Sequence, residues 1–174
     1  MGKKILLYGY GPEQDKMLAL LARLEIEARV ISGEEQDCTI GELCDRKKAP
    51  VPGEAEPAEL PLMIFSDFTR EELDEVLTAC RQEGITVKSL KAMVTPTNRS
   101  WTIRALSEEI AEEHRVMGAL MELKKLRDPV GMPDFRNVPL MSALMQADNL
   151  LSGQQEVTFE QVQRAYRNLQ AALR

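Results

Sequence analysis

The segment between positions 95 and 102 gathers more potential ligand-binding side chains than any other part of the chain. It offers short hydroxyl and amide groups, one guanidinium and one indole, carried by Thr95, Thr97, Asn98, Arg99, Ser100, Trp101 and Thr102. This segment lies where an expected strand runs into an expected helix. The first N–H groups of a helix lack partners within the helix and face the positive end of its dipole, so they suit an anion. The predicted ligand is therefore a carboxylate or a phosphate.

The same residues have a structural interpretation that needs no ligand. Ser, Thr and Asn often cap helices and shape turns through hydrogen bonds to nearby backbone groups. Trp101 would then fill the core beside the turn. We favour this interpretation over an anion site because these residue types serve so often as caps alone.

A second strand-to-helix turn, Tyr8-Gly9-Tyr10-Gly11, is similar to the start of a dinucleotide-binding fingerprint. The third glycine of that fingerprint would fall at Gln14, whose side chain obstructs helix–strand packing and close approach to a pyrophosphate. We therefore predict no cofactor. Tyr8 and Tyr10 stay in the candidate site as neighbours of the 95–102 turn.

The remaining residues with reactive side chains form no recognisable catalytic or metal-binding set. On the expected helix, the residues one turn from His114 are apolar or small, so we place His114 at the surface or in an interface. Cys38, Cys44 and Cys80 have no Cys-x-x-Cys spacing and no neighbouring histidine, so reduced thiols are expected. The sequence predicts no catalytic residue and no metal site, and it favours a protein that is not an enzyme.

The net charge and the hydropathy pattern limit the classes of partner that we expect. The 174 residues include 22 Lys and Arg against 28 Asp and Glu, a net charge of −6. Non-specific binding to the phosphate backbone of a nucleic acid needs a positively charged surface. We therefore expect no nucleic-acid partner. The apolar run from Ile5 to Tyr8 is too short for a signal-peptide core or a membrane span. We expect a cytoplasmic protein with no membrane partner.

The order of the elements predicts an α/β fold. Strand, helix and strand occur twice, from Lys4 to Ser32 and from Leu62 to Val94, which suggests two βαβ units on one four-stranded sheet. We favour a ferredoxin-like arrangement, in which both helices cover one face of an antiparallel sheet. The alternative treats a short helix after Thr39 as a crossover in a small doubly wound parallel sheet.

Helix signals are strongest at three capping boxes, which begin at Thr39, Thr69 and Thr158. A long helix is expected from Ile103 to Arg127, lying across the remaining sheet face, and Asn137 can cap another. The predicted organisation is therefore an α/β domain with a long covering helix over residues 1–128 and a helical hairpin extension over 129–174. The proline-rich stretch 46–61 reads as an exposed loop.

Two segments carry a resemblance. The strand from Lys4 to Gly9 and the segment from Leu90 to Thr102, with its Val-Thr-Pro-Thr-Asn-Arg-x-Trp run, resemble a bacterial family of small proteins classed as a domain of unknown function. The resemblance covers roughly the first 115 residues, and the tail from Pro129 onward lies outside it. It implies no activity, cofactor or partner.

The leading hypothesis is a non-catalytic regulatory or protein-interaction module. The surface from Ile103 to Leu126 and the C-terminal helices would bind a protein partner or a second copy, giving a homodimer. One alternative is a small-anion or metabolite-binding domain that uses the 95–102 turn. Another is an enzyme of unrecognised type.

Overall fold

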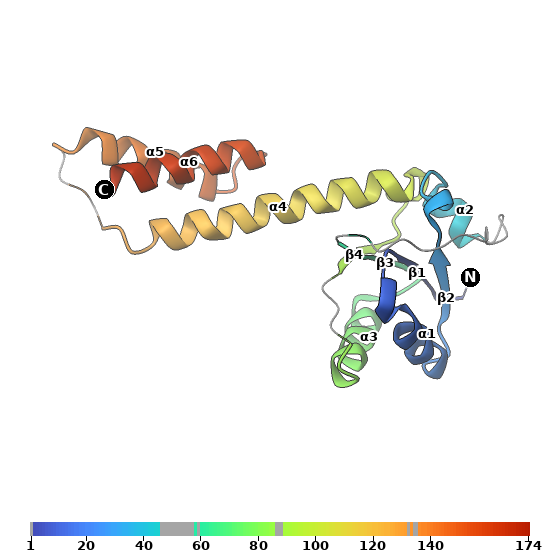
Figure 1. Cartoon of the computed structure of the whole chain (residues 1–174). Helices are drawn as coiled ribbons and strands as arrows, with labels where there is room; N and C mark the ends of the chain where they lie inside the picture. Colours follow the sequence, from blue (N-terminus) through green and yellow to red (C-terminus); the bar gives the residue numbers. More distant parts are fainter. Residues whose placement is uncertain (1, 46–57, 59, 86–88, 132, 134–135) are drawn as a thin grey trace. The chain divides into compact units, whose positions relative to one another are not determined.

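The computed structural model describes residues 2–45, 58, 60–85, 89–131, 133 and 136–174 (Figure 1). The chain divides into two compact units, Met1–Glu109 and Ile110–Arg174. The division falls within the long helix, whereas the sequence suggests a boundary at 128/129. The loop predicted over 46–61 lies largely outside the described residues.

The first unit contains a four-stranded sheet and its covering helices. Its elements are β1 (Lys4–Tyr8), η1 (Gly11–Glu13), α1 (Gln14–Arg23), β2 (Glu27–Ile31), η2 (Gly33–Glu35), α2 (Ile40–Cys44), β3 (Leu62–Ser66), α3 (Arg70–Gln82), β4 (Leu90–Met93) and η3 (Asn98–Ser100). Helix α4 (Ile103–Arg127) begins in this unit and continues into the second, which adds α5 (Val138–Leu151) and α6 (Phe159–Ala172).

The sheet has the strand order β2-β1-β3-β4. β1 pairs directly with β2, and β3 with β4, both in parallel, while β1 and β3 run antiparallel at the centre. The prediction of two βαβ units on one sheet is confirmed. The ferredoxin-like arrangement is not found, because it requires an entirely antiparallel sheet in which each unit is split by a strand of the other. The doubly wound alternative fails as well, because the central pair is antiparallel.

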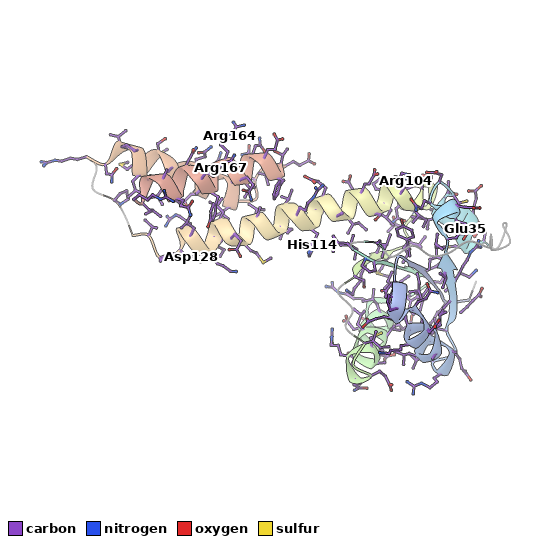
Figure 2. The ribbon with its side chains drawn as sticks, in the orientation of Figure 1. Glu35, Arg104, His114, Asp128, Arg164 and Arg167 are labelled. Carbon is purple, nitrogen blue, oxygen red and sulfur yellow. The ribbon has the colours of Figure 1, made fainter. Side chains whose placement is uncertain are left out.

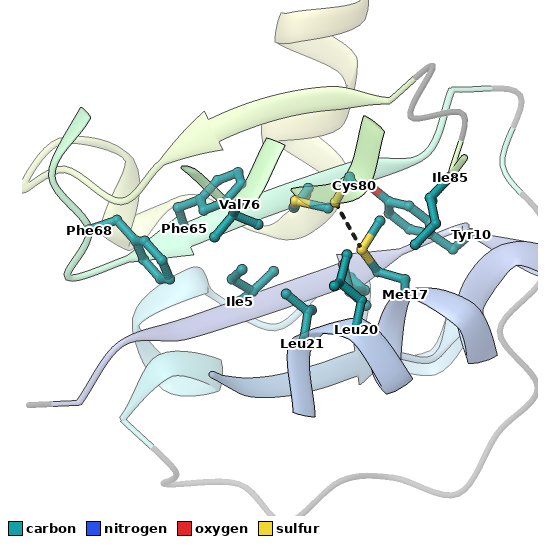
Figure 3. Close-up of a cluster of buried hydrophobic side chains, with 12 residues drawn as sticks. Ile5, Tyr10, Met17, Leu20, Leu21, Phe65, Phe68, Val76, Cys80 and Ile85 are labelled. Atoms are coloured by element: carbon teal, nitrogen blue, oxygen red, sulfur yellow. Dashed lines mark hydrogen bonds between the residues drawn. The ribbon is translucent and has the colours of Figure 1, made fainter. Parts of the chain in front are cut away.

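One sheet face packs against α1 and α3. Side chains alternate along a strand, so Ile5, Leu7 and Phe65 all point to this face. The core there consists of Ile5, Leu7, Tyr10, Met17, Leu20, Leu21, Met63, Phe65, Phe68, Val76, Cys80 and Ile85 (Figure 3). The rings of Phe65 and Phe68 meet edge to face with centroids 5.3 Å apart. The two crossover helices therefore share one continuous core.

The opposite face carries the other set of alternating strand residues, among them Leu6 and Ile64, which are buried. Helix α2 and the start of α4 supply further buried side chains, including Ile40 and Ile103. The two helix starts are joined by backbone bonds, since the N–H of Ile40 donates to Trp101 O at 2.9 Å. The first turns of α4 therefore help to cover this unit, together with α2.

The three predicted capping boxes are all present. The N–H of Thr39 donates to the carboxylate of Glu42 at 2.9 Å, and the N–H of Glu42 donates to Thr39 Oγ1 at 3.3 Å. Thr69 and Thr158 form the same reciprocal pair with the third residue of their helices. Since an N-cap contributes about 1 kcal/mol, these local signals fix where α2, α3 and α6 begin.

The second unit is a helical bundle built from most of α4 with α5 and α6. Its core consists of Ala119, Leu123, Ala143, Leu144, Ala147, Leu150, Val162, Ala165 and Leu169. The guanidinium of Arg127 makes two bonds, of 2.7 and 3.1 Å, to the carboxylate of Asp148, which fastens the end of α4 to α5. Among the described residues, no helix has the length and apolarity needed to cross a membrane.

Candidate functional site

The 95–102 turn is built around the side chain of Asn98. Its Oδ1 accepts from the N–H of Thr95 at 2.8 Å, and its Nδ2 donates to Met93 O at 2.9 Å. In return, the N–H of Asn98 donates to Thr95 Oγ1 at 3.2 Å. The amide of Asn98 is therefore used to close the turn after β4.

The first N–H groups of α4, on which an anion site would depend, all have partners. Those of Ile103 and Arg104 donate to Cys38 O and Gln36 O, at 3.3 and 3.0 Å. The next two donate to the hydroxyl and the carbonyl of Thr102, at 3.1 and 3.0 Å. Likewise, the hydroxyl of Ser100 donates to the carbonyl of Thr97 at 3.3 Å. This geometry supports the capping interpretation and gives an anion no free helix N–H.

Arg99 carries the turn's only charge, and this charge is paired with the carboxylate of Asp45 at the end of α2. The bond and charge of Asp45 raise the pKa of the Arg99 guanidinium. The Arg99 side chain passes close to Gly41, where an added Cβ would lie 3.0 Å from Arg99 Cγ and 3.1 Å from Arg99 O. Arg99 therefore docks the turn onto α2.

The structural interpretation predicted that Trp101 fills the core beside the turn, and this prediction is wrong. Trp101 is 36 % exposed, so the ring is not enclosed by the core. Its backbone takes the structural role instead, because its carbonyl accepts from Ile40. The extended conformation of Trp101 after η3 lets the segment pair with the start of α2.

The two tyrosines of the candidate site are not brought together. Tyr10 is buried in the α1/α3 core, where its hydroxyl donates to Ser89 Oγ at 2.9 Å, and burial raises its pKa to about 12. Tyr8 is half-buried at the end of β1 and belongs to the alternate set of strand residues. The conformation of the Tyr8-Gly9-Tyr10-Gly11 turn requires a glycine at position 9. Gly9 has a φ of +74°, and an added Cβ would lie 2.3 Å from the Cβ of Ala58.

The cysteines are all free and buried. Burial raises the pKa of the Cys44 and Cys80 thiols, which keeps them protonated and unreactive. In the part of the chain that the structure describes, no group of three or more His, Cys, Asp and Glu side chains could hold a metal ion. His114 is exposed on α4 (Figure 2).

The second unit exposes an apolar surface on α4 itself. Met117 and Met121, one helical turn apart, are 57 % and 56 % exposed. They lie on the side of α4 opposite Ala119 and Leu123, which pack into the bundle core. Glu113 precedes the two methionines and Lys124 follows them at helical spacing. We call Glu113, Met117, Met121 and Lys124 the outward face of α4.

A groove of about 430 Å³ lies beside the outward face, between α4 and α6. It is lined by His114, Arg115, Gly118, Ala119, Glu122, Phe159, Gln163 and Tyr166. Gly118 leaves open space, since an added Cβ there would meet nothing within 4 Å. The groove extends the apolar surface around the two methionines toward the aromatic side chains of α6.

The comparisons with known proteins bear on the first unit and on the start of the second. Residues 61–117 match the model of a family described as Domain of unknown function (DUF3783). The matched range contains β3, α3, β4 and the 95–102 turn, and so includes the Val-Thr-Pro-Thr-Asn-Arg-x-Trp run on which the resemblance rests. It stops at Met117 and leaves out β1 and the C-terminal hairpin. No curated protein and no solved structure matches the chain significantly.

Sequence reasoning missed the partners of Arg99. Asp45 is 54 residues away, and the sequence contains no signal that links the two. Gly41 did give a signal, because a glycine inside a capping box of a five-residue helix is unfavourable unless another chain segment passes close by.

Proposed function

We propose that this protein is a non-catalytic protein-interaction module that forms a homodimer through the outward face of α4. The supporting observation is the exposure of Met117 and Met121 on a helix whose opposite side is already packed. Methionine side chains are flexible and polarisable, and they are common at surfaces that bind proteins. Two neighbouring methionines that are each more than half exposed are therefore the strongest interaction feature of the second unit.

The charges around the methionines suit a second copy in an antiparallel orientation. Glu113 lies six residues before the midpoint of the two methionines, and Lys124 lies five residues after it. A two-fold axis at that midpoint would set each Glu113 beside the Lys124 of the other copy. Such an interface is self-complementary, as required for a symmetric dimer. A parallel pairing would instead bring like charges together.

The expected dimer is weak. Burying a methionine contributes about 1.5–3 kcal/mol, so the four methionines of a dimer contribute on the order of 6–12 kcal/mol. Association costs about 4–15 kcal/mol, and exposed ion pairs add only about 0–1 kcal/mol each. Because each methionine is only 56–57 % exposed in the monomer, the gain is smaller than full burial would give, and the cost of association offsets most of it. The dimer is therefore expected to form only at high protein concentration.

Sedimentation of the full chain over a wide concentration range tests the proposal. The wild type is expected to shift from monomer to dimer, and the double variant Met117→Glu, Met121→Glu is expected to remain monomeric. Met145→Glu is the matched control, since Met145 is 69 % exposed but lies on α5. A wild-type chain that stays monomeric at several hundred micromolar would refute the proposal, as would equal effects of the α4 and α5 variants.

A further inference from the structure

A polar cavity lies in the first unit, at the end of the central strand pair where β1 begins and β3 ends. Its volume is about 320 Å³, and its lining includes Lys4, Glu27, Cys44, Asp45, Ser66 and Asp67. Lys4 and Ser66 are direct partners in the antiparallel ladder, so their side chains stand together on the α2 face of the sheet. The cavity's described lining contains no residue of the 95–102 turn, but Asp45 links it to that turn through its pairing with Arg99.

The floor of the cavity contains two buried polar side chains, Lys4 and Ser66, each only 4 % exposed. The ammonium of Lys4 donates to Cys44 O at 2.9 Å and lies 3.1 Å from a carboxylate oxygen of Glu27. An ammonium has three N–H donors, and within the described part of the chain these are its two partners. One donor of a buried cation therefore remains for a group inside the cavity. Unsatisfied buried donors are unfavourable, so an acceptor there stabilises the site.

The rim of the cavity carries negative charge, opposite to that of Lys4. Asp45 is paired with Arg99, whereas Asp67 makes no ion pair with any described residue and is bonded only to the Ser66 hydroxyl, at 3.5 Å. Lys4 and Arg99 supply two positive charges, and Glu27, Asp45 and Asp67 supply three negative ones. The excess negative charge resides on Asp67, and it favours a cationic group at the mouth of the cavity.

We propose that this cavity binds a free amino acid. The ammonium group of the ligand would pair with Asp67 in place of the Ser66 hydroxyl, whose single O–H would then turn to the ligand. The carboxylate of the ligand would accept from this hydroxyl and from the third N–H of Lys4. Small-molecule pockets span about 300–1,000 Å³, and a volume near the lower limit suits a small ligand such as an amino acid. A simple amine could pair only with Asp67 at the mouth of the cavity, and a simple carboxylate could bind only Lys4 and Ser66 at its floor.

Thermal unfolding of the full chain with each of the twenty amino acids tests the proposal. A ligand that binds only the folded state raises the melting temperature, so at least one amino acid is expected to do so. Methylamine and acetate, the separate halves of the ligand, are expected to give no comparable shift. No shift with any of the twenty, or an equal shift with methylamine alone, would overturn the proposal.

A pair of variants locates the binding site. Asp67 has a φ of +61°, which Asn tolerates, so Asp67→Asn removes the charge and keeps the turn. The affinity of the Asp67→Asn variant for the amino acid, measured by calorimetry, is expected to be about tenfold or more below that of the wild type, because a charge-assisted hydrogen bond is lost. Asp37→Asn is the control, since Asp37 is exposed and outside the cavity lining.

Three further outcomes complete the test. If Asp67→Asn fails to fold, Ser66→Ala provides the same test from the floor of the cavity and is expected to weaken binding. If Asp67→Asn binds the amino acid as tightly as the wild type, the proposed site is wrong. If magnesium chloride stabilises the wild type but no amino acid does, and Asp67→Asn abolishes that effect, the ligand is a cation and the proposal is overturned.

Discussion

The guanidinium of Arg99 is paired with the carboxylate of Asp45, which joins the turn before α4 to the residue that caps the end of α2, 54 positions away in the sequence. The path between them passes Gly41, where the absence of a side chain lets the Arg99 backbone and stem come close. The same region holds the bonds from Ile40 to Trp101 and from Ile103 to Cys38. Helix α2 and the start of α4 therefore form one hydrogen-bonded layer on the sheet.

This close approach predicts that Gly41→Ala destabilises the first unit. Alanine favours a helix over glycine by about 0.5–1 kcal/mol, but overpacking costs about 1–3 kcal/mol, and one of the atoms in the way is the Arg99 carbonyl oxygen. The net expectation is a loss of about 1 kcal/mol. Urea unfolding followed by the fluorescence of Trp101, the single tryptophan, measures it in this unit.

Gly118→Ala is the matched control, because Gly118 is also helical but has nothing within 4 Å of an added Cβ. The helix preference for alanine then acts alone, and we expect a gain of about 0.5–1 kcal/mol in the second unit, measured by circular dichroism. If both substitutions shifted stability in the same direction, close packing at Gly41 would not be the cause.

The features that the sequence predicted correctly are those set by neighbouring residues. A capping box is complete within four positions, so Thr39, Thr69 and Thr158 mark their helices without help from the rest of the fold. The uninterrupted apolar run of β3 likewise identifies a strand that is buried on both faces. Asn98 was recognised as a turn residue on the same local grounds.

Strand order could not be obtained in this way. β1 is buried on both faces and presents the same apolar surface to either neighbour, so its residues do not reveal whether β2 or β3 lies beside it. The burial of aromatic rings was equally hard to predict: Trp101 was expected in the core, and the sequence did not indicate that Tyr10 is buried. Whether an aromatic ring is buried depends on which distant segment covers it, and Tyr10 is covered by α3 and Ser89, far along the chain.

The proposed dimer predicts a specific response to charge reversal on α4. Glu113→Lys or Lys124→Glu alone sets like charges against each other across the two-fold axis, and each is expected to weaken dimerisation severalfold. The double variant restores opposite charges and is expected to recover most of the affinity. Sedimentation at low salt measures both effects, since screening reduces them.

Lys125→Glu is the control for this experiment. Lys125 lies outside the outward face. Like Lys124, which bonds to Asp128 at 2.8 Å, it already has a carboxylate partner within the chain, Glu122 at 2.7 Å. Its reversal changes the net charge equally and is expected to leave the dimer affinity unchanged. A fall in affinity as large as that of Lys124→Glu would show that net charge alone controls association, and the antiparallel arrangement would be rejected.

The buried hydroxyl of Tyr10 predicts that stability falls in strongly alkaline solution. Burial raises the pKa of this group from 10.0 to about 12, so between these values the unfolded chain loses the proton while the folded chain keeps it. Because the folded state then binds more protons than the unfolded state, the free energy of unfolding decreases as the pH rises. The contribution is complete below pH 10 and is lost progressively up to about pH 12.

A difference of this size corresponds to on the order of 2–3 kcal/mol, since one pKa unit equals about 1.4 kcal/mol. Tyr10→Phe removes the titrating group, and its unfolding free energy is expected to vary less with pH than that of the wild type over this interval. The variant should be somewhat less stable at neutral pH, because the bond to Ser89 is lost. Tyr166→Phe, on the half-buried side of α6, corrects for general alkaline effects. If the Tyr10→Phe curve ran parallel to the wild-type curve above pH 10, the Tyr10 hydroxyl would ionise equally well in the folded chain, and its burial would be disproved.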